Sequence, residues 1–507
     1  MKKSLMTTFF TGMLCLQAET ATGQIDLAIE DLGSRGATGL TSSPDPLFIS
    51  SPIVKAGDIN LDGFDDFVLQ IGNSSTGYSE ALLIFGGKWI NRRSSKRLGL
   101  QGRRAPFDSI RFFIGVGDIN SVSAVGSFDG SGSPGLAFGV KFARGMGLPK
   151  DEGVFVISGE VIDSITGQEF ELSSGLEGSS RFIYSDNFDY GATIENIGDF
   201  NGDGFDDLLI GSWLSGYFDL LLGGRIGDEP DDSTFIDVGQ FSNLRLLQMQ
   251  GPINGSSFSR LSSVVTRLGD FNDDGFDDFA VSDPGISLNS QFQGEVYIFF
   301  GRDLDSPVAV DESYFDEGRG IRVPGLGRTR ELGSIMFKIP DLDRDRQPEL
   351  AIFADGFLDP AVLFVILSAA RFDSEIALGG ISGASGFSAT FPESVSPSTV
   401  KPIGSWHGDS PAGISVGWRA AGEGNLGILP GPMLEKGLNG DFVIDPDEEP
   451  TGIQVFSEVI NPFSFSAETF ELGDVNADGV TDYGIREASR ILNLYDGDVI
   501  FAGTFEP

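Results

Sequence analysis

Short apolar runs alternate along the chain with acidic or glycine-rich turns. In one stretch an apolar run over 263–268 is followed by a second over 279–281 and a third over 294–301, with glycine, proline or serine between them. Runs of this length, rich in aromatic and β-branched residues and bounded by turn residues, are typical of strands. Sustained helical periodicity is hard to find. The pattern predicts an all-β protein.

One acidic pattern recurs between these runs: Gly-Asp, an alternating Asp/Asn/Asp loop with glycine, a closing acid and an apolar run. Copies starting at 58, 199, 270, 341 and 474 keep their acids, whereas decayed copies at 127 and 405 lose most of them. The seven starts are 69, 72, 71, 71, 64 and 69 residues apart. Four strands per unit, stacked radially, are typical of propeller blades. The sequence predicts a seven-bladed β-propeller of four-stranded antiparallel blades over 24–507.

The chain ends predict how such a ring closes. The segment 497–503 matches the third strand of a blade, and the chain then stops one strand short. An apolar segment lies in surplus before the first loop, within 25–45. We expect part of 25–45 to pair with the C-terminal blade, so that an N-terminal strand closes the ring and the blades form one cooperative domain.

The composition and the net charge of the chain restrict the classes of partner that it can bind. The 507 residues include 70 glycines and 43 phenylalanines, and the formal net charge is −40. Nucleic-acid phosphates are bound through Lys and Arg, so this charge argues against nucleic acid and against adsorption to an anionic membrane. High acidity instead favours solubility in salt or the binding of cations.

Residues 1–23 have the layout of a secretory signal peptide. Two lysines precede an apolar stretch over 5–16, and small residues over 21–23 predict cleavage before Gln24. The stretch is shorter than the roughly 20 residues of a membrane helix, and we expect no transmembrane segment. A lipoprotein at Cys15 is the alternative, although Leu14 before it is not small. We expect a protein without disulfides, secreted or at the cell surface, with the periplasm as an alternative.

The five acidic loops carry a ligand pattern for calcium. Positions 1, 3 and 5 offer side-chain oxygens, position 7 a backbone carbonyl and position 9 a closing acid, with a sharp turn at position 6. Calcium takes six to eight oxygen ligands, whereas zinc would need His or Cys. Position 12, an acid in EF-hands, is apolar here. We predict up to five Ca²⁺ sites with a mainly structural role, formed by Asp58, Asn60, Asp62, Phe64 and Asp66; Asp199, Asn201, Asp203, Phe205 and Asp207; Asp270, Asn272, Asp274, Phe276 and Asp278; Asp341, Asp343, Asp345, Gln347 and Glu349; and Asp474, Asn476, Asp478, Val480 and Asp482.

For any single loop the alternative is a turn without metal, because Asn, Asp and Gly also form good turns. Five copies in one register favour calcium. The copy at 341 departs most from the pattern, since Arg346 replaces the glycine of position 6. The two decayed copies should bind no metal.

The loop and its apolar run, at this period, resemble the FG-GAP repeats of integrin α-subunit propellers. The segment 281–285 lies where that family has its Gly-Ala-Pro element, and 188–191 and 258–260 lie near the Phe-Gly element. The resemblance covers roughly 25–507, although most copies lack a literal Phe-Gly or Gly-Ala-Pro. It implies metal loops on one face of the disc and variable loops for partners on the other. Because nothing remains for a leg or anchor, we expect a stand-alone exported monomer rather than an integrin-type heterodimer.

Two classes of function remain open. One is a non-catalytic binding or adhesion module with a protein or glycan ligand, which the fold alone does not identify. The stretch 88–104 has seven Lys or Arg and no acid. This basic stretch either binds an anionic partner or is a solvated strand surface that neutralises its neighbours.

The alternative is an extracellular enzyme that acts on polysaccharide, a lyase or a hydrolase. The single histidine, His407, lies in a decayed loop, and no serine elbow, cysteine nucleophile or zinc signature is present. The four tryptophans could form a sugar platform or pack in the core. We expect no enzyme and assign no catalytic residue.

Overall fold

The computed structural model of the chain describes residues 24–495 apart from internal gaps, the longest at 88–97, 100–108, 225–233, 404–412, 445–453 and 458–467. The predicted signal peptide over 1–23 lies outside the described residues, as do most of the basic stretch and the decayed loop that holds His407. No helix in the described part has the length and apolar character needed to cross a membrane.

The protein is all-β, as predicted. The described strands form sheets of four to six strands and one two-stranded ribbon, β20 (Ser287–Leu288) with β21 (Gln291–Phe292). Helix is limited to short segments of the described chain: α1 (Gly159–Ser164), α2 (Glu312–Asp316) and the 3₁₀ turns η1 (Leu172–Ser174), η2 (Leu378–Gly380) and η4 (Glu435–Asn439).

Consecutive strands build each sheet, and the neighbours within these groups of strands are antiparallel. In chain order the groups are β3 (Leu47–Gly57), β4 (Asp66–Asn73), β5 (Tyr78–Ile84) and β7 (Ser109–Phe113); β8 (Asp118–Gly126), β9 (Gly135–Lys141), β10 (Gly153–Ile157) and β12 (Arg181–Tyr184); β13 (Thr193–Gly198), β14 (Asp207–Ser212), β15 (Tyr217–Leu221) and β17 (Arg245–Gln250); β18 (Val265–Gly269), β19 (Asp278–Asp283), β22 (Glu295–Phe299) and β24 (Gly320–Pro324); β25 (Arg330–Ile339), β26 (Glu349–Asp355), β27 (Val362–Ile366) and β28 (Gly386–Thr390); β29 (Ser396–Ile403), β30 (Gly413–Ala420), β31 (Glu423–Leu429) and β33 (Gln454–Ser457); and β34 (Glu468–Gly473), β35 (Asp482–Arg486) and β36 (Ile491–Tyr495).

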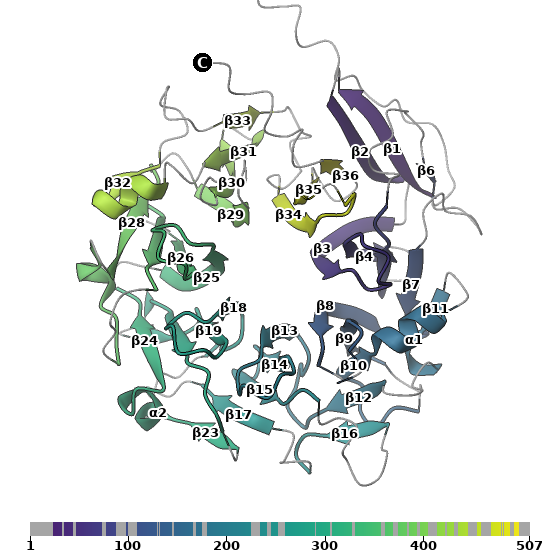
Figure 1. Cartoon of the computed structure of the whole chain (residues 1–507), viewed down its shortest axis with the longest axis horizontal. Helices are drawn as coiled ribbons and strands as arrows, with labels where there is room; N and C mark the ends of the chain where they lie inside the picture. Colours follow the sequence, from purple (N-terminus) through teal and green to yellow (C-terminus); the bar gives the residue numbers. More distant parts are fainter. Residues whose placement is uncertain are drawn as a thin grey trace, which may run out of the picture.

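The sheets lie around a central axis, with the first strand of each group innermost (Figure 1). These inner strands contact one another in chain order, from β3 through β8, β13, β18, β25 and β29 to β34, and β34 also contacts β3. The arrangement is consistent with a propeller.

The outer edges differ from the prediction of purely antiparallel, four-stranded units. The connection between the third and fourth strands of several sheets reaches back to the preceding sheet and pairs there in parallel with its outermost strand. A sheet edge presents unpaired N–H and C=O groups, and this added strand satisfies part of them. The added strands are β11 (Glu169–Glu171) on β7, β16 (Phe235–Asp237) on β12, β23 (Val308–Val310) on β17 and β32 (Phe442–Val443) on β28.

The two ends of the chain share one sheet, in the order β34-β35-β36-β2-β1-β6. β2 (Arg35–Ser43) pairs antiparallel with β36, as expected for part of 25–45, and β1 (Gln24–Leu32) continues the sheet to β6 (Leu98–Gly99). The third strand of this sheet is 491–495, however, and not the predicted 497–503, which lies outside the described residues. An earlier apolar segment, Ile-Leu-Asn-Leu-Tyr, takes that place in the sheet.

The core lies between neighbouring sheets, because the sheets from β4 to β28 bury side chains on both faces. In β19, Phe279 packs toward the sheet of β15, where it joins a cluster with Phe218, whereas Ala280 packs toward the sheet of β26. Phe279 and Phe299 stack with ring centroids 4.8 Å apart. Strand side chains alternate between faces, so a sheet buried on both faces needs the near-continuous apolar runs seen in the sequence.

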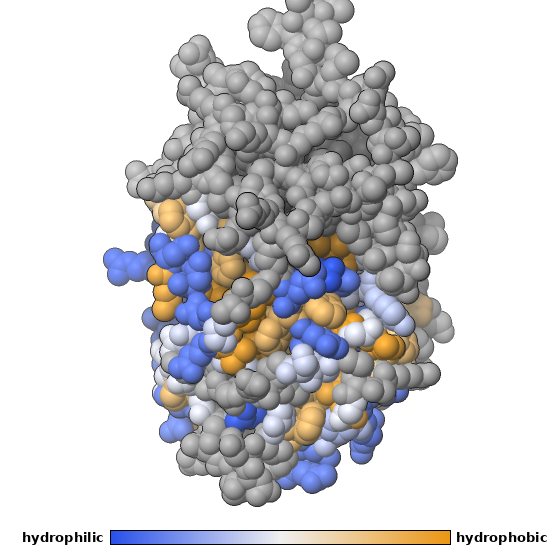
Figure 2. Space-filling model, turned by 90° about the vertical axis from the view of Figure 1, so that its right-hand side faces the viewer, coloured by the Kyte–Doolittle hydropathy of each residue, from blue (hydrophilic) through white to orange (hydrophobic). Residues whose placement is uncertain are grey.

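At the outer side of the molecule, hydrophilic and hydrophobic residues of the described part are interspersed (Figure 2). The apolar side chains of the cores lie between the sheets, whereas the described residues on this one side of the molecule form a mixed surface.

Deleting 24–43 should lower the melting temperature, because β36 would lose its antiparallel partner over Ala37–Thr41. Each lost backbone hydrogen bond costs about 1 kcal/mol. Thermal melts and limited proteolysis of 468–495 check this, and a synthetic 24–43 peptide added in trans should restore part of the loss. An unchanged melt would mean that β2 contributes little to the sheet.

Candidate metal loops and the central pocket

The five acidic loops occupy the same connection in five sheets, between the innermost strand and the next one. They join β3 to β4, β13 to β14, β18 to β19, β25 to β26 and β34 to β35. Because the connection is equivalent in each sheet, the loops emerge at equivalent ends of the sheets.

The first three loops share one set of hydrogen bonds between acids and backbone. The Asp58 carboxylate accepts from the N–H groups of Asp62 (2.9 Å) and Gly63 (2.8 Å). The Asp66 carboxylate accepts from the N–H groups of Ile59 (2.9 Å) and Gly86 (2.8 Å). The loops at 199 and 270 repeat all four bonds. The first and ninth acids therefore fold each of these three loops back on itself, and the ninth acid also ties the loop to the end of the third strand.

The sharp turn predicted at position 6 is present. Glycines at this position have φ near +90° in four loops (63, 204, 275 and 479), a left-handed conformation that glycine adopts without strain. Arg346 has φ 80° at the same position, which costs roughly 1–2 kcal/mol for a residue with a Cβ. The decayed copy at 127 keeps this backbone, with Gly130 and Gly132 at φ 71° and 82°.

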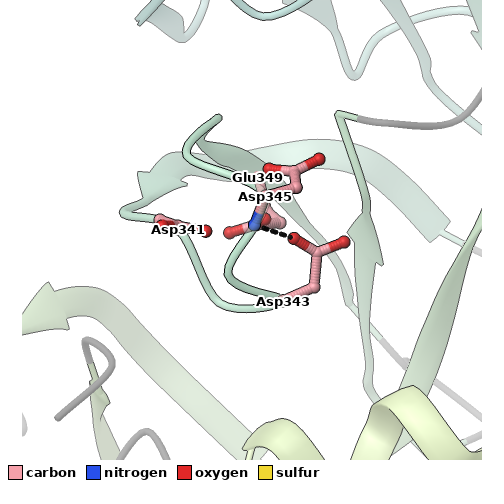
Figure 3. A group of neighbouring side chains, drawn as sticks. All are labelled: Asp341, Asp343, Asp345 and Glu349. Carbon is pink, nitrogen blue, oxygen red and sulfur yellow. Dashed lines mark hydrogen bonds between the residues drawn. The ribbon is translucent and has the colours of Figure 1, made fainter.

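The loop that departs most in sequence gathers four carboxylates, a group found among the described residues. Oxygens of Asp341, Asp343, Asp345 and Glu349 lie within 4.8 Å of one another (Figure 3). Glu349 accepts from the N–H of Leu342 at 2.7 Å through one oxygen. Its other oxygen, and Asp341 Oδ1, are buried and have no hydrogen-bond partner among the described residues. Buried, unpaired carboxylate oxygens are costly, and a cation would satisfy them.

Burial shifts the pKa of the ninth acid in the loops at 58, 199, 270 and 341. It raises the pKa of Asp66 and Asp207 to about 7, and that of Asp278 and Glu349 to about 8. The neighbouring loop acids raise these pKa values further, whereas the backbone N–H donors lower them. The cause is the loss of water around a charged group. A cation in the loop would favour the ionised form.

The structure describes only part of the loop at 474. Asp474 accepts from the N–H of Gly479 at 2.8 Å, and Asp482 accepts from the N–H of Val475 at 3.0 Å. Asp478 and Val480 lie outside the described residues. At the seventh position the N–H groups of Phe64, Phe205 and Phe276 donate to the fifth-position Asp of their loops. Calcium ligation by each predicted set stays a prediction.

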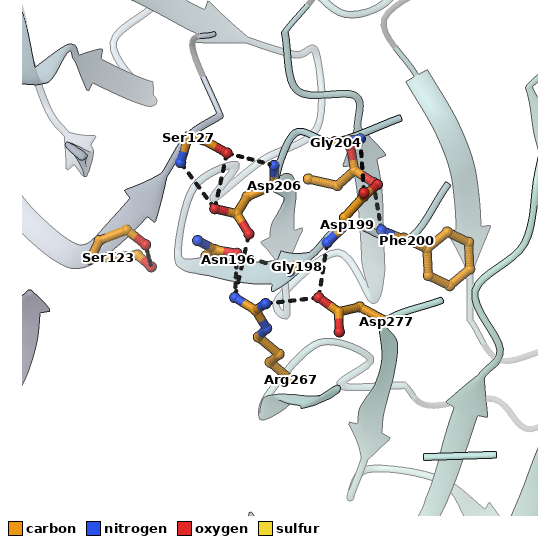
Figure 4. Close-up of polar contacts among 12 residues, drawn as sticks. Ser123, Ser127, Asn196, Gly198, Asp199, Phe200, Gly204, Asp206, Arg267 and Asp277 are labelled. Carbon is orange, nitrogen blue, oxygen red and sulfur yellow. Dashed lines mark hydrogen bonds and ion pairs between the residues drawn. The ribbon is translucent and has the colours of Figure 1, made fainter. Parts of the chain in front are cut away.

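Sequence reasoning missed the acid at position 8. Asp65, Asp206 and Asp277 contact the preceding loop rather than their own. Asp277 Oδ2 accepts from the N–H of Asp199 at 3.0 Å, and Asp206 Oδ2 accepts from the N–H of Ser127 at 2.9 Å (Figure 4). The Asp-Asp pair at positions 8 and 9, present in three copies, was the available signal.

A pocket of about 370 Å³ lies among the inner strands. Its lining includes Glu195 of β13, Arg267 of β18, Lys338 of β25 and Glu471 of β34. Burial raises the pKa of Glu195 to about 7, against the opposing effect of Arg267. Burial, then Arg267, lowers the pKa of Lys338.

Most of the tryptophan side chains that could form a sugar-binding surface lie outside the described residues. Trp89 and Trp406 belong to gaps, and the side chain of Trp418 is not described. Trp213 is half-buried in the turn between β14 and β15.

Replacing Glu195 with Gln should stabilise the protein at high pH. A raised carboxyl pKa means that the folded state holds the proton more tightly than the unfolded state, so stability falls as pH rises from 4.5 to about 7 and stays reduced above it. The difference in melting temperature between Glu195→Gln and the wild type should be positive at pH 9 and shrink toward pH 5. Melts at fixed, saturating calcium measure it, and a less stable variant at pH 9 would contradict it.

No family model matches the chain. Among curated proteins it is similar to integrin alpha-V of Gallus gallus, 26% identical over 322 residues, which is 62% of this chain and 27% of that protein. It is 28% identical to integrin alpha-4 of Xenopus laevis over 168 residues, 32% of this chain and 14% of that one. It is 31% identical to the phosphatidylinositol-glycan-specific phospholipase D of Rattus norvegicus over 139 residues, 25% of this chain and 16% of that one.

The chain thus matches less than a third of the length of each of these relatives. The similarity to integrin α chains extends over a third to two-thirds of this chain, and the repeated small sheets agree with it. The predicted resemblance to the FG-GAP propellers of integrin α subunits is confirmed.

Proposed function

We propose that this chain is an exported, closed seven-bladed propeller that acts as a non-catalytic binding or adhesion module. The observation that carries the proposal is the similarity to integrin α chains over as much as 62% of the chain. The match to the phospholipase covers 16% of that enzyme and gives little support to catalysis.

Two features support the closed ring. The inner strands contact one another from β3 to β34, and β34 contacts β3 again. β2 pairs with β36, which ties residues near the two ends of the chain into one sheet. A sheet with two apolar faces is stable only between two neighbours, so a ring leaves no such face exposed.

Calcium would hold the inner ends of the blades. All five loops offer carboxylate and amide oxygens, the donors that calcium prefers. The unpaired buried oxygens of Asp341 and Glu349 fit a cation in the fourth loop. A bound ion would cancel the repulsion among the acids and tie the first and second strands of a blade together.

Removing calcium should lower the melting temperature. We expect up to five ions per chain, and Asp203→Asn, which alters a fifth-position ligand, should remove one of them. Asp129→Asn and Asp409→Asn in the decayed loops are matched controls and should leave the ion count unchanged. Metal analysis and melts with and without chelator measure both quantities.

An unchanged melt in excess chelator, with the metal content confirmed near zero, would contradict a structural role for calcium. An ion count that Asp203→Asn leaves unaltered would contradict ligation by the loop at 199.

The binding function predicts a protein or glycan partner. Integrin alpha-V matches over 62% of the chain, and the end of the sheets opposite the metal loops carries connections of differing length such as the β14–β15 and β19–β22 turns. A glycan and matrix-protein array probed with the purified chain should give a ligand whose binding weakens when calcium is removed. Turnover of an arrayed polysaccharide, rather than retention on it, would favour the enzyme alternative.

A further inference from the structure

Neighbouring loops at 199 and 270 are joined by direct contacts (Figure 4). The N–H of Asp199 donates to Asp277 Oδ2 at 3.0 Å, and the N–H of Asp277 donates to the carbonyl of Asp199 at 3.2 Å. The N–H of Arg302 donates to the carbonyl of Phe200 at 2.8 Å. The backbone of the first two positions of one loop is therefore held by the following blade.

Side chains also pack closely where the loops at 199 and 270 meet, a contact between neighbouring loops that is called a junction below. A Cβ at Gly202 would lie 2.6 Å from the Phe276 ring, so the seventh residue of one loop packs on the fourth residue of the other. A Cβ at Gly198 would collide with the Asp277 carboxylate. The two loops thus fit each other closely.

Arg267 bridges the acids at the eighth position. Its guanidinium lies 2.7 Å from Asp277 Oδ2 and 3.4 Å from Asp206 Oδ1, and it also donates to Asn196 Oδ1. Asp206 precedes the last ligand of the loop at 199, and Asp277 precedes the last ligand of the loop at 270. The Arg267 guanidinium therefore orients an acid that lies next to a predicted calcium ligand in each of the two loops.

The junctions are not all alike. The N–H of Asp474 donates to Asp65 Oδ2 at 2.9 Å and the N–H of Asp65 donates to the carbonyl of Asp474, so the loops at 474 and 58 repeat the arrangement. In the loop at 341 the eighth residue is Pro348, which has no carboxylate. There the contact with the loop at 270 is made by the side chain of Gln347, which donates to Asp273 at 3.1 Å.

We propose that Asp277 and Arg267 are positioning residues that couple cation binding in the loops at 199 and 270, an inference that rests on the proposed calcium binding. An ion at 270 orders Phe276 and Asp278 as ligands, and so fixes Asp277 between them. Asp277 in turn fixes the backbone of Asp199, the first ligand of the other loop. Each ion lowers the ordering cost of the other site, and the effect is reciprocal.

The test uses the full chain with the other three loops emptied by Asp62→Asn, Asp345→Asn and Asp478→Asn. Calcium titration calorimetry of this background should show two ions that bind with positive cooperativity. Emptying one further loop by Asp274→Asn should weaken the remaining site at 199 by about 5-fold or more, the lower range of allosteric coupling. Asp277→Ala should abolish the cooperativity while two ions still bind. Asp273→Asn, which removes one charge from the same loop but faces the next blade, should preserve it.

If the variant with three altered loops does not fold, a double-mutant cycle in the otherwise unaltered chain takes the place of the calorimetry. Asp203→Asn and Asp274→Asn, singly and together, should be non-additive in calcium-dependent stabilisation, and Asp277→Ala should remove this non-additivity. The pair Asp274→Asn and Asp345→Asn, across the junction with Pro348, should be closer to additive.

The outcomes separate the two proposals. Two independent ions whose affinities Asp277→Ala leaves unchanged would overturn the coupling and leave calcium binding in place. Absence of calcium binding would overturn both. A lower melting temperature for Asp277→Ala with cooperativity intact would assign the residue a structural role alone.

Discussion

The burial of both faces of each small sheet against its neighbours is the constraint on which the rest of the structure depends. A sheet such as β18-β19-β22-β24 places Phe279 and Phe299 in one interface and Ala280 and Ile298 in the other. Fully burying one such large side chain contributes about 1.5–3 kcal/mol, so a sheet on its own would lose most of its stability. The apolar contacts between neighbouring sheets are therefore required for the stability of each sheet.

The neighbouring sheets are joined at three radii. At the outer edge a strand from one sheet pairs in parallel on the one before, as β11 does on β7. At mid-radius the apolar side chains interdigitate. At the inner end the acids at the eighth position accept from the backbone of the preceding loop. Within one sheet, the pairing of β2 with β36 joins residues near the two ends of the chain.

In the loops at 58, 199 and 270 the acids divide between two tasks. The first acid accepts from the backbone of its own loop, the ninth acid accepts from its own loop and from a residue just after the third strand, and burial raises the pKa of the ninth acid. The eighth position turns the other way, to the neighbouring blade. Backbone donors, Arg267 and the proposed cations offset the repulsion among the acids of these loops.

The sequence by itself determined the all-β class, the repeat and the position of the acidic loops, because these follow from local chemistry. Gly275 among its neighbouring acids is a local turn signal, and the run Phe-Ala-Val after Asp278 predicts a strand. Only the tertiary structure decided the partner of Asp277, the parallel strands at the outer edges of four sheets, and 491–495 as the third strand of the sheet that joins the chain ends. The same applies to the loop at 341, which is the weakest match in sequence and yet gathers four carboxylates. Each of these depends on groups brought together from distant parts of the chain, and apolar periodicity in one segment does not encode which other segment will lie against it.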